Sequence, residues 1–410
     1  MKKNLLLLSL FLFNLQIIFA QDIQIEQLKK HIGYLASDKL KGRGTASKGE
    51  RRAAKYIAAY YKKLGLEPKG NDGSYFQHFN FKRSKDPHGT VDNSARTERS
   101  KNVAAFLNNG AEYTVVIGAH YDHLGLGHDH NSREANPVGL VHNGADDNAS
   151  GTAGVMELAR ILKENGKTEK YNYLFLHFSG EELGLIGSKK FCEKPTVDLK
   201  SINYMLNMDM IGRLNAERVL KMGGVGSAPD FVPTIQSLNS EIKIKQDSSG
   251  MDASDHTSFY LQNIPVLFAF TGQHDDYHKA SDDADKINFE GEKMVLQYLI
   301  KLIENLDSKH KQTFQETKNN QQKVGGFKVT MGVMPDYVYE GTGMRIDGVT
   351  DGKPAAKAGI KKGDVVIKLG EDSINDVMGY MKALGKYKKG DKTSVTVSRG
   401  AENISFDITF

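Results

Sequence analysis

The chain has 410 residues, of which 39% are hydrophobic and 26% charged. This balance excludes a disordered or fibrous protein and indicates a globular protein of two or three domains. Its formal net charge of +5 comes from 55 basic and 50 acidic side chains that are mixed along the chain, so we expect no nucleic-acid partner. A single cysteine, Cys192, excludes an intramolecular disulfide and a multi-cysteine metal site, and any metal ion must be held by histidines and carboxylates.

The first twenty residues are typical of an export signal. Lys2 and Lys3 precede an apolar run over 5–20 that ends at Ala20, a suitable cleavage site for signal peptidase. An uncleaved membrane anchor is the alternative, although the run is short for a full span. No later stretch has eighteen uninterrupted apolar residues. We therefore expect an exported protein, periplasmic or secreted, without stable membrane insertion after cleavage.

The next part of the chain predicts an α/β domain. Apolar residues recur at helical spacing over 24–35 and 48–64, on either side of a flexible loop. Apolar runs between turn residues then predict buried strands, which alternate with further helices. The strands are expected at 113–118, 173–178, 204–208 and 265–270, and the helices at 151–164, 183–191 and 290–306. Continuous apolar strands that alternate with helices indicate a largely parallel sheet. The stretches 83–100 and 128–142 look like loop insertions.

The composition changes after the helix at 290–306. Residues 308–324 are almost entirely polar and predict a linker or an extended helix end. From 325 to 410 the pattern is one of short strands and glycine-bounded turns, with one helix near 375–384. The sequence thus divides into a signal peptide (1–20), a first domain (21–307), the linker and a second domain (325–410).

Four of the predicted strands lead into histidines or carboxylates at their C-terminal ends. These residues are His120 and Asp122, then Glu181 and Glu182, then Asp209, and, after a short loop, Tyr277 and His278. A loop with Asp146 and Asp147 lies between the first two strands. Ligands of open α/β sheets bind beyond the carboxyl ends of the strands, so we expect these side chains to gather at one edge of the sheet.

So many carboxylates at one edge would repel one another without a cation. A set of histidines and carboxylates without thiolates suits Zn²⁺, with Mn²⁺ or Co²⁺ as substitutes. Two histidines and three carboxylates are more ligands than one catalytic zinc takes. They fit two ions about 3.5–4 Å apart that share a bridging carboxylate and a water. One further carboxylate then remains to act as a base.

Five motifs make the sequence resemble the co-catalytic di-zinc aminopeptidases, metallopeptidase family twenty-eight, which also includes carboxypeptidase Q and the transferrin-receptor-like proteins. They are HYDHLG (120–125), NGADDNASG (143–151), GEELGLIGS (180–188), NMDMIGR (207–213) and YHKASDD (277–283). The resemblance covers roughly 23–306. It implies the zinc exopeptidase fold, a doubly wound, mostly parallel sheet flanked by helices.

The resemblance also implies the metal ligands. One zinc would be bound by His120 and Asp209, and the other by Glu182 and His278. Asp146, the first of the paired aspartates, would bridge both ions.

Other residues take supporting roles by the same resemblance. Glu181 would be the general base for the bridging water. Asp122 would lie behind His120 and orient its imidazole, and Asp147 would lie outside the ligand set. Tyr277 matches a tyrosine that steadies the oxyanion in some members. Four further histidines close in sequence, at 123, 128, 130 and 142, are expected on the surface of loops.

The C-terminal region resembles a bacterial-type PDZ domain. The motif is GMRIDGV (343–349) followed by GKPAAKAGIKKGDVVI (352–367). PDZ domains bind an extended peptide as an added strand at a sheet edge. The resemblance places this edge at Gly343, Met344, Arg345 and Ile346, opposite the helix near 375–384. The alternative is a packing module with an empty groove.

Together these features predict an exported zinc exopeptidase, an aminopeptidase that acts on peptides, with a PDZ domain for a peptide or protein ligand. The same scaffold supports carboxypeptidase, dipeptidase or glutaminyl-cyclase chemistry, although the related cyclases line their pocket with tryptophan and this chain has none. An alternative of another class is a peptide-binding adaptor with a dead peptidase domain. The presence of all five expected ligands together with Glu181 argues against it.

Overall fold

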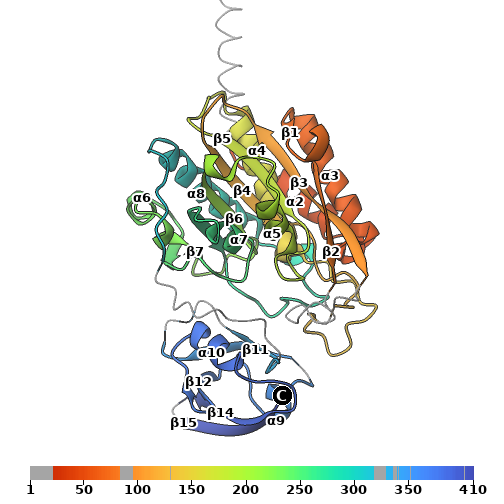
Figure 1. Ribbon diagram of the computed structural model, residues 1–410, viewed down its shortest axis with the longest axis vertical. Coiled ribbons are helices and arrows are strands. Elements are labelled where there is room, and N and C mark those ends of the chain that lie inside the picture. The colour runs from red at the N-terminus through yellow and green to blue at the C-terminus, as the bar shows by residue number, and fades with distance from the viewer. Residues whose placement is uncertain are drawn as a thin grey trace, which may run out of the picture.

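A computed structural model of the protein describes residues 22–83, 96–129, 131–317, 329–335, 339, 341–350, 352–400 and 402–410. The expected signal peptide, 1–20, lies outside them. Within these ranges the chain forms a large sheet and a smaller one, each with its own helices (Figure 1). No helix among the described residues is long and apolar enough to cross a membrane.

The large sheet belongs to the first domain and has nine strands. They are β1 (Glu67–Pro68), β2 (Phe76–Lys82), β3 (Thr97–Leu107), β4 (Thr114–His120), β5 (Asn172–Phe178), β6 (Ile202–Met208), β7 (Val219–Gly223), β8 (Lys243–Gln246) and β9 (Val266–Phe270). Their order is β1-β3-β5-β4-β6-β9-β7-β8, with β2 paired to β3. The four central strands, β5, β4, β6 and β9, are all parallel to one another.

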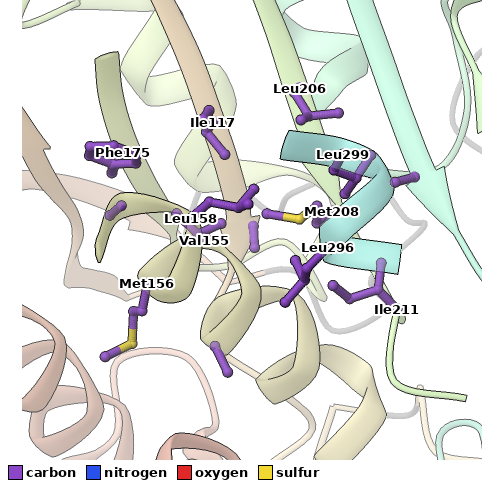
Figure 2. Close-up of a cluster of buried hydrophobic side chains, with 14 of the residues drawn as sticks. Ile117, Val155, Met156, Leu158, Phe175, Leu206, Met208, Ile211, Leu296 and Leu299 are labelled. Atoms are coloured by element: carbon purple, nitrogen blue, oxygen red, sulfur yellow. The ribbon is translucent and has the colours of Figure 1, made fainter. Parts of the chain in front are cut away.

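Helices cover both faces of this sheet. They are α2 (Ile25–Leu35), α3 (Lys48–Leu64), α4 (Gly151–Glu164), α5 (Ile186–Glu193), α6 (Phe231–Ser237), α7 (His256–Tyr260) and α8 (Phe289–Asp307). One face packs against α2, α3, α4, α6 and α8, and the other against α5 and α7. Figure 2 shows the larger core, where Ile117 and Leu206 of the sheet meet Leu158 of α4 and Leu296 of α8. Because both faces are covered, the central strands are buried at every position.

The α/β fold and its central strands are confirmed, and each predicted helix and strand of the first domain is found within a few residues of its expected bounds. The sheet is mixed, however, because β3 runs antiparallel to β5 and β7 runs antiparallel to β9. Parallel pairing thus runs through the four central strands and recurs between β7 and β8 at one end of the sheet.

The second domain has a six-stranded sheet with two short helices. Its elements are β10 (Val333–Pro335), β11 (Met344–Val349), α9 (Pro354–Ala358), β12 (Val365–Leu369), β13 (Asp372–Ser373), α10 (Val377–Leu384), β14 (Lys392–Arg399) and β15 (Glu402–Thr409). The strand order is β10-β11-β12-β14-β15, and β13 pairs with β12. A separate hydrophobic core lies between this sheet and the helices.

This strand order corrects the predicted peptide groove. The groove was expected along Gly343, Met344, Arg345 and Ile346, but β11 has β10 on one side and β12 on the other. The side chains of Met344 and Ile346 are buried in the core, and the Gly343 amide donates to the carbonyl of Asn375. Among the described residues, the strand that ends the sheet on this side is β10.

The predicted linker, 308–324, is in part a piece of the first domain. The Phe314 ring packs against Tyr260 of α7 with ring centroids 5.2 Å apart. The Thr317 amide donates to the Tyr260 hydroxyl at 2.8 Å, and the Gln312 amide donates to Asn203 Oδ1 at 2.6 Å. The first domain therefore extends to Thr317, ten residues beyond the predicted boundary, and residues 318–324 lie outside the described part of the chain.

Candidate active site

The site lies at the point where the strand order of the sheet reverses. The chain passes from β4 to β5 on one side and then crosses back to β6 on the other side of β4. His120 is the last residue of β4, and Asp209 follows directly after β6. The His120 Nε2 atom lies 3.3 Å from Asp209 Oδ1. This is the crevice in which open α/β sheets bind their ligands.

A second pair of the same kind stands beside the first. Glu182 follows β5 and His278 follows β9, and His278 Nε2 lies 3.2 Å from Glu182 Oε2. Asp147 lies between the two pairs, because its Oδ1 is 3.3 Å from His120 Nε2 and its Oδ2 is 3.2 Å from His278 Nε2. The structure thus brings together four of the five predicted ligands and adds Asp147.

The prediction that Asp146 is the bridging carboxylate is wrong for this geometry. Its carboxylate points into the protein, where Oδ1 accepts hydrogen bonds from the Gly212 amide at 2.7 Å and the Ser150 hydroxyl at 3.0 Å. Its Oδ2 lies 3.1 Å from His274 Nε2. The loop directs adjacent side chains to different sides, so only Asp147 faces the histidines. The peptide bond that follows Asp147 is cis.

The hydrogen bonds at Nδ1 of His120 and His278 determine which ring nitrogen faces the carboxylates. His120 Nδ1 lies 3.2 Å from the carbonyl oxygen of Asp122, and His278 Nδ1 lies 2.7 Å from the carbonyl oxygen of Asn131. A carbonyl only accepts, so each Nδ1 carries a proton and each Nε2 is the ring nitrogen turned toward the carboxylates. Each Nε2 can either donate a proton to these carboxylates or, in the neutral ring, offer its lone pair to a metal ion held among them. The donor set therefore fits metal ions.

Asp122 supports the site in another way than predicted. Its Oδ1 is 3.8 Å from His120 Nδ1, too far for a hydrogen bond, and its backbone carbonyl orients the ring instead. The carboxylate accepts from the Glu181 amide at 3.2 Å and from the Thr45 hydroxyl at 2.7 Å. Burial raises the pKa of Asp122 to about 6. The side chain of Asp122 thus positions the backbone of Glu181.

Glu181 lies beside the ligand pairs and opens into the same cleft. Its Oε2 is 4.0 Å from His120 Nε2, farther than the carboxylates of Asp147 and Asp209. Burial and the negative charges of Glu182 and Asp209 raise the pKa of Glu181 well above its ordinary value. It is therefore a carboxylate that takes up a proton readily.

Tyr277 also lines the cleft. Its ring stacks on that of His278, with centroids 3.9 Å apart. Together with Met210, Phe268 and Phe270 it forms one apolar wall. The other lining residues of the described cleft are His120, Asp147, Glu181, Asp209, Asp252, Ala253, Gln273 and His278. The cleft thus combines an acidic floor with an apolar wall and has no lysine or arginine among these residues.

Sequence reasoning missed two contributors. His123, expected on a loop surface, is buried, and its Nδ1 lies 2.7 Å from Glu182 Oε1. It fits there because residue 144 is a glycine with φ of 59°; a Cβ on Gly144 would lie 2.4 Å from the His123 ring. Asn131, in the predicted insertion 128–142, orients His278. The spacing of His123 from His120 within HYDHLG was the available signal, whereas nothing in the sequence marks Asn131.

The remaining three histidines of this region differ from one another. His128 is exposed, as expected, and His130 lies outside the described residues. His142 is buried, and its Nε2 lies 2.7 Å from the Ser132 hydroxyl. It supports the loop that carries Asn131.

Residues 102–303 match the family model described as peptidase family M28, and residues 313–410 match the model of the PDZ domain. A probable leucine aminopeptidase of Trichophyton verrucosum is 29% identical over 201 residues, which are 46% of this chain and 51% of that protein. The matched region thus spans about half the length of this curated relative.

Solved structures share the fold at low identity. A zinc aminopeptidase from Bacillus subtilis superposes with a TM-score of 0.56 at 16% identity, over 73% of this chain and all of that one. A glutaminyl cyclase from Bacteroides thetaiotaomicron, bound to N-acetylhistamine, gives a TM-score of 0.53 at 15% identity, over 69% of this chain and 98% of that one. Residues 102–303 therefore form a peptidase family M28 domain, and a PDZ domain follows it in the same chain.

Proposed function

We propose that this protein is a zinc-dependent aminopeptidase with two metal ions. His120 and Asp209 would hold one ion, Glu182 and His278 would hold the other, and Asp147 would bridge them. The observation that carries the proposal is the position of the Asp147 carboxylate, 3.2–3.3 Å from the Nε2 atoms of both histidines. The likeness of the fold to a zinc aminopeptidase supports the choice of metal.

When bound, zinc would supply a Lewis acid for the peptide carbonyl and for the attacking water. The protein's part is to move the proton. Glu181 stands beside the ligands, and its carboxylate would accept the water proton and deliver it to the leaving amine. The Asp122 carboxylate accepts a hydrogen bond from the Glu181 amide, and this contact holds the Glu181 side chain at the cleft. The Tyr277 hydroxyl would steady the negative oxygen that develops on the carbonyl.

The lining of the cleft favours an aminopeptidase over a carboxypeptidase. A carboxypeptidase needs a cationic side chain for the C-terminal carboxylate of its substrate, and the described lining has neither lysine nor arginine. A free α-amine, in contrast, is positively charged and suits the carboxylates of the floor. The apolar wall of Met210, Phe268, Phe270 and Tyr277 would take the side chain of the N-terminal residue.

We also propose that the PDZ domain captures an extended peptide as an added strand at the outer edge of β10. This is the end strand of the described sheet, and main-chain hydrogen bonds would supply the affinity. Lys362 of this domain contacts Asp275 in the loop that carries Tyr277 and His278. A peptide captured by this domain would therefore be tethered to the same chain as the cleft.

Export is proposed from the sequence alone. Lys2, Lys3 and the apolar run to Ala20 support it. We expect the mature protein to begin at Gln21 and to be recovered in the periplasm or the medium. N-terminal sequencing of the protein from each fraction checks this, and a full-length chain that stays with the membrane would contradict it.

The metal assignment predicts different effects for the two adjacent aspartates. Asp147→Asn should lose both zinc ions, because it removes the one carboxylate shared by the two sites, whereas Asp146→Asn should still take up two ions at saturating zinc, because its carboxylate anchors the loop and is not a ligand. Native mass spectrometry counts the ions in each variant. Loss of zinc from Asp146→Asn with two ions retained in Asp147→Asn would show that Asp146 is the bridging carboxylate and would contradict the structure.

The role of Glu181 predicts a loss of turnover without a loss of metal. Glu181→Gln should keep both ions and lower kcat by about 10²–10⁴-fold, because an amide cannot accept the water proton. Steady-state hydrolysis of a leucine anilide measures it, with Glu182→Gln as the matched control that should weaken zinc binding first. The wild type should leave N-acetylated substrates intact. Equal cleavage of blocked and free substrates would exclude an aminopeptidase.

The proposed role of the PDZ domain predicts a change in KM that depends on substrate length. A chain that ends at Thr317 keeps Phe314 and all described metal-site residues, so it should cleave the anilide as the full chain does. For long peptides KM should rise with kcat little changed, because the tether no longer raises their local concentration. Equal losses on both substrates would show that the domain is structural.

A further inference from the structure

The loop that presents Asp147 lies between two buried ions of opposite charge. On one side, Arg43 donates from Nη1 to the carbonyl of Asn143 at 2.6 Å and from Nη2 to the carbonyl of Gly144 at 2.9 Å. On the other side, Asp282 accepts from the amides of Asp146 at 3.1 Å and Asp147 at 3.0 Å. Arg43 and Asp282 are both completely buried. The cation thus holds the carbonyls of this loop and the anion holds its amides.

Arg43 also reaches the strand that carries His120. Its Nε donates to the carbonyl of Tyr121 at 2.8 Å, and Nη1 donates to the carbonyl of Leu35 at 2.5 Å. A single guanidinium, with donors in a fixed planar arrangement, therefore ties the end of β4 to the loop of Asp147. Every hydrogen bond found for Arg43 ends on a backbone carbonyl, so its position is set by backbone rather than by a carboxylate partner.

Asp282 connects the same loop to His278. It lies four residues after His278, and its own carbonyl accepts from the Ala145 amide at 2.9 Å. Asp282 thus accepts from three amides of the loop, through its carboxylate and its backbone carbonyl. Arg43 thus links the loop to the segment of His120, and Asp282 links it to the segment of His278.

Burial of an ion is costly unless several hydrogen bonds compensate for the lost water. Neutral side chains would fill the same space at lower cost, but they would not hold several backbone groups at fixed distances. We propose that Arg43 and Asp282 are positioning residues for the metal site. By holding the carbonyls and amides of 143–147, they set where the Asp147 carboxylate stands between His120 and His278. The proposal rests on the proposed function, in which Asp147 bridges two metal ions.

The test uses Asp282→Asn and Arg43→Lys in the full chain. The asparagine has the shape of the aspartate, but its amide group cannot accept from the loop amides as both carboxylate oxygens do. The lysine keeps the positive charge, but one ammonium group cannot reach the three carbonyls of Tyr121, Asn143 and Gly144. The control is Arg160→Lys, which disturbs another buried ion pair, with Glu157 of α4, that makes no hydrogen bond to this loop.

Two measurements separate positioning from general stability. Zinc affinity is measured by competition with a chelator, and the visible absorption spectrum of the Co²⁺-substituted protein reports the geometry of the ligands. Loss of such supporting contacts typically weakens metal binding by about 10–100-fold. We expect a loss of this size and a shifted spectrum for Asp282→Asn and Arg43→Lys. Arg160→Lys should lower the melting temperature but leave both readouts unchanged.

Unchanged affinity and spectrum in folded Asp282→Asn would overturn the proposal, and so would an equal loss of affinity in Arg160→Lys. If Arg43→Lys does not fold, Asp282→Asn decides, because it changes charge with little change in shape. Failure of the proposed function looks different: wild-type protein that binds no zinc, or Asp147→Asn that keeps both ions, would remove the metal site itself.

Discussion

The arrangement of this active site depends on one electrostatic constraint. The Nε2 atoms of two imidazoles face the oxygens of three carboxylates at 3.2–3.3 Å in a largely buried cleft. Repulsion between the carboxylates grows when water is excluded, so the folded chain brings them together only if a positive charge, on the rings or on metal ions between them, offsets the repulsion. The fold must therefore do two things: hold these side chains rigidly, and turn both Nε2 atoms toward the carboxylates.

Rigidity comes from the central strands and orientation from the loops. The strands β4, β5, β6 and β9 are buried on both faces, so their C-terminal ends have little freedom, and each end delivers one or two functional residues. The loops add contacts that act on single atoms. The carbonyls of Asp122 and Asn131 fix the protons of the two histidines, and His123 holds the outer oxygen of Glu182.

This division explains what the sequence could and could not predict. Residues at strand ends were predicted, because apolar runs show where strands end and the parallel arrangement brings these ends together. The choice between Asp146 and Asp147 was wrong, because the two residues are chemically identical and only the backbone of the loop decides which one faces the histidines. The peptide groove was wrong for a similar reason. Whether β11 is an edge or an interior strand depends on its pairing with β10, which the local motif does not contain.

The two aspartates show how the loop joins the site into one unit. Asp147 faces the cleft, and Asp146 faces the interior, where it holds the Gly212 amide beyond Asp209 and the His274 ring before Tyr277. The inward carboxylate thus ties the loop to the two neighbouring segments that carry ligands, while Arg43 and Asp282 hold its backbone. A carboxylate that bridges two ions must stay at a fixed distance from both. Its loop therefore has to be held rigidly against the segments that carry the other ligands. The adjacent aspartates meet that requirement because one serves as a ligand and the other anchors it.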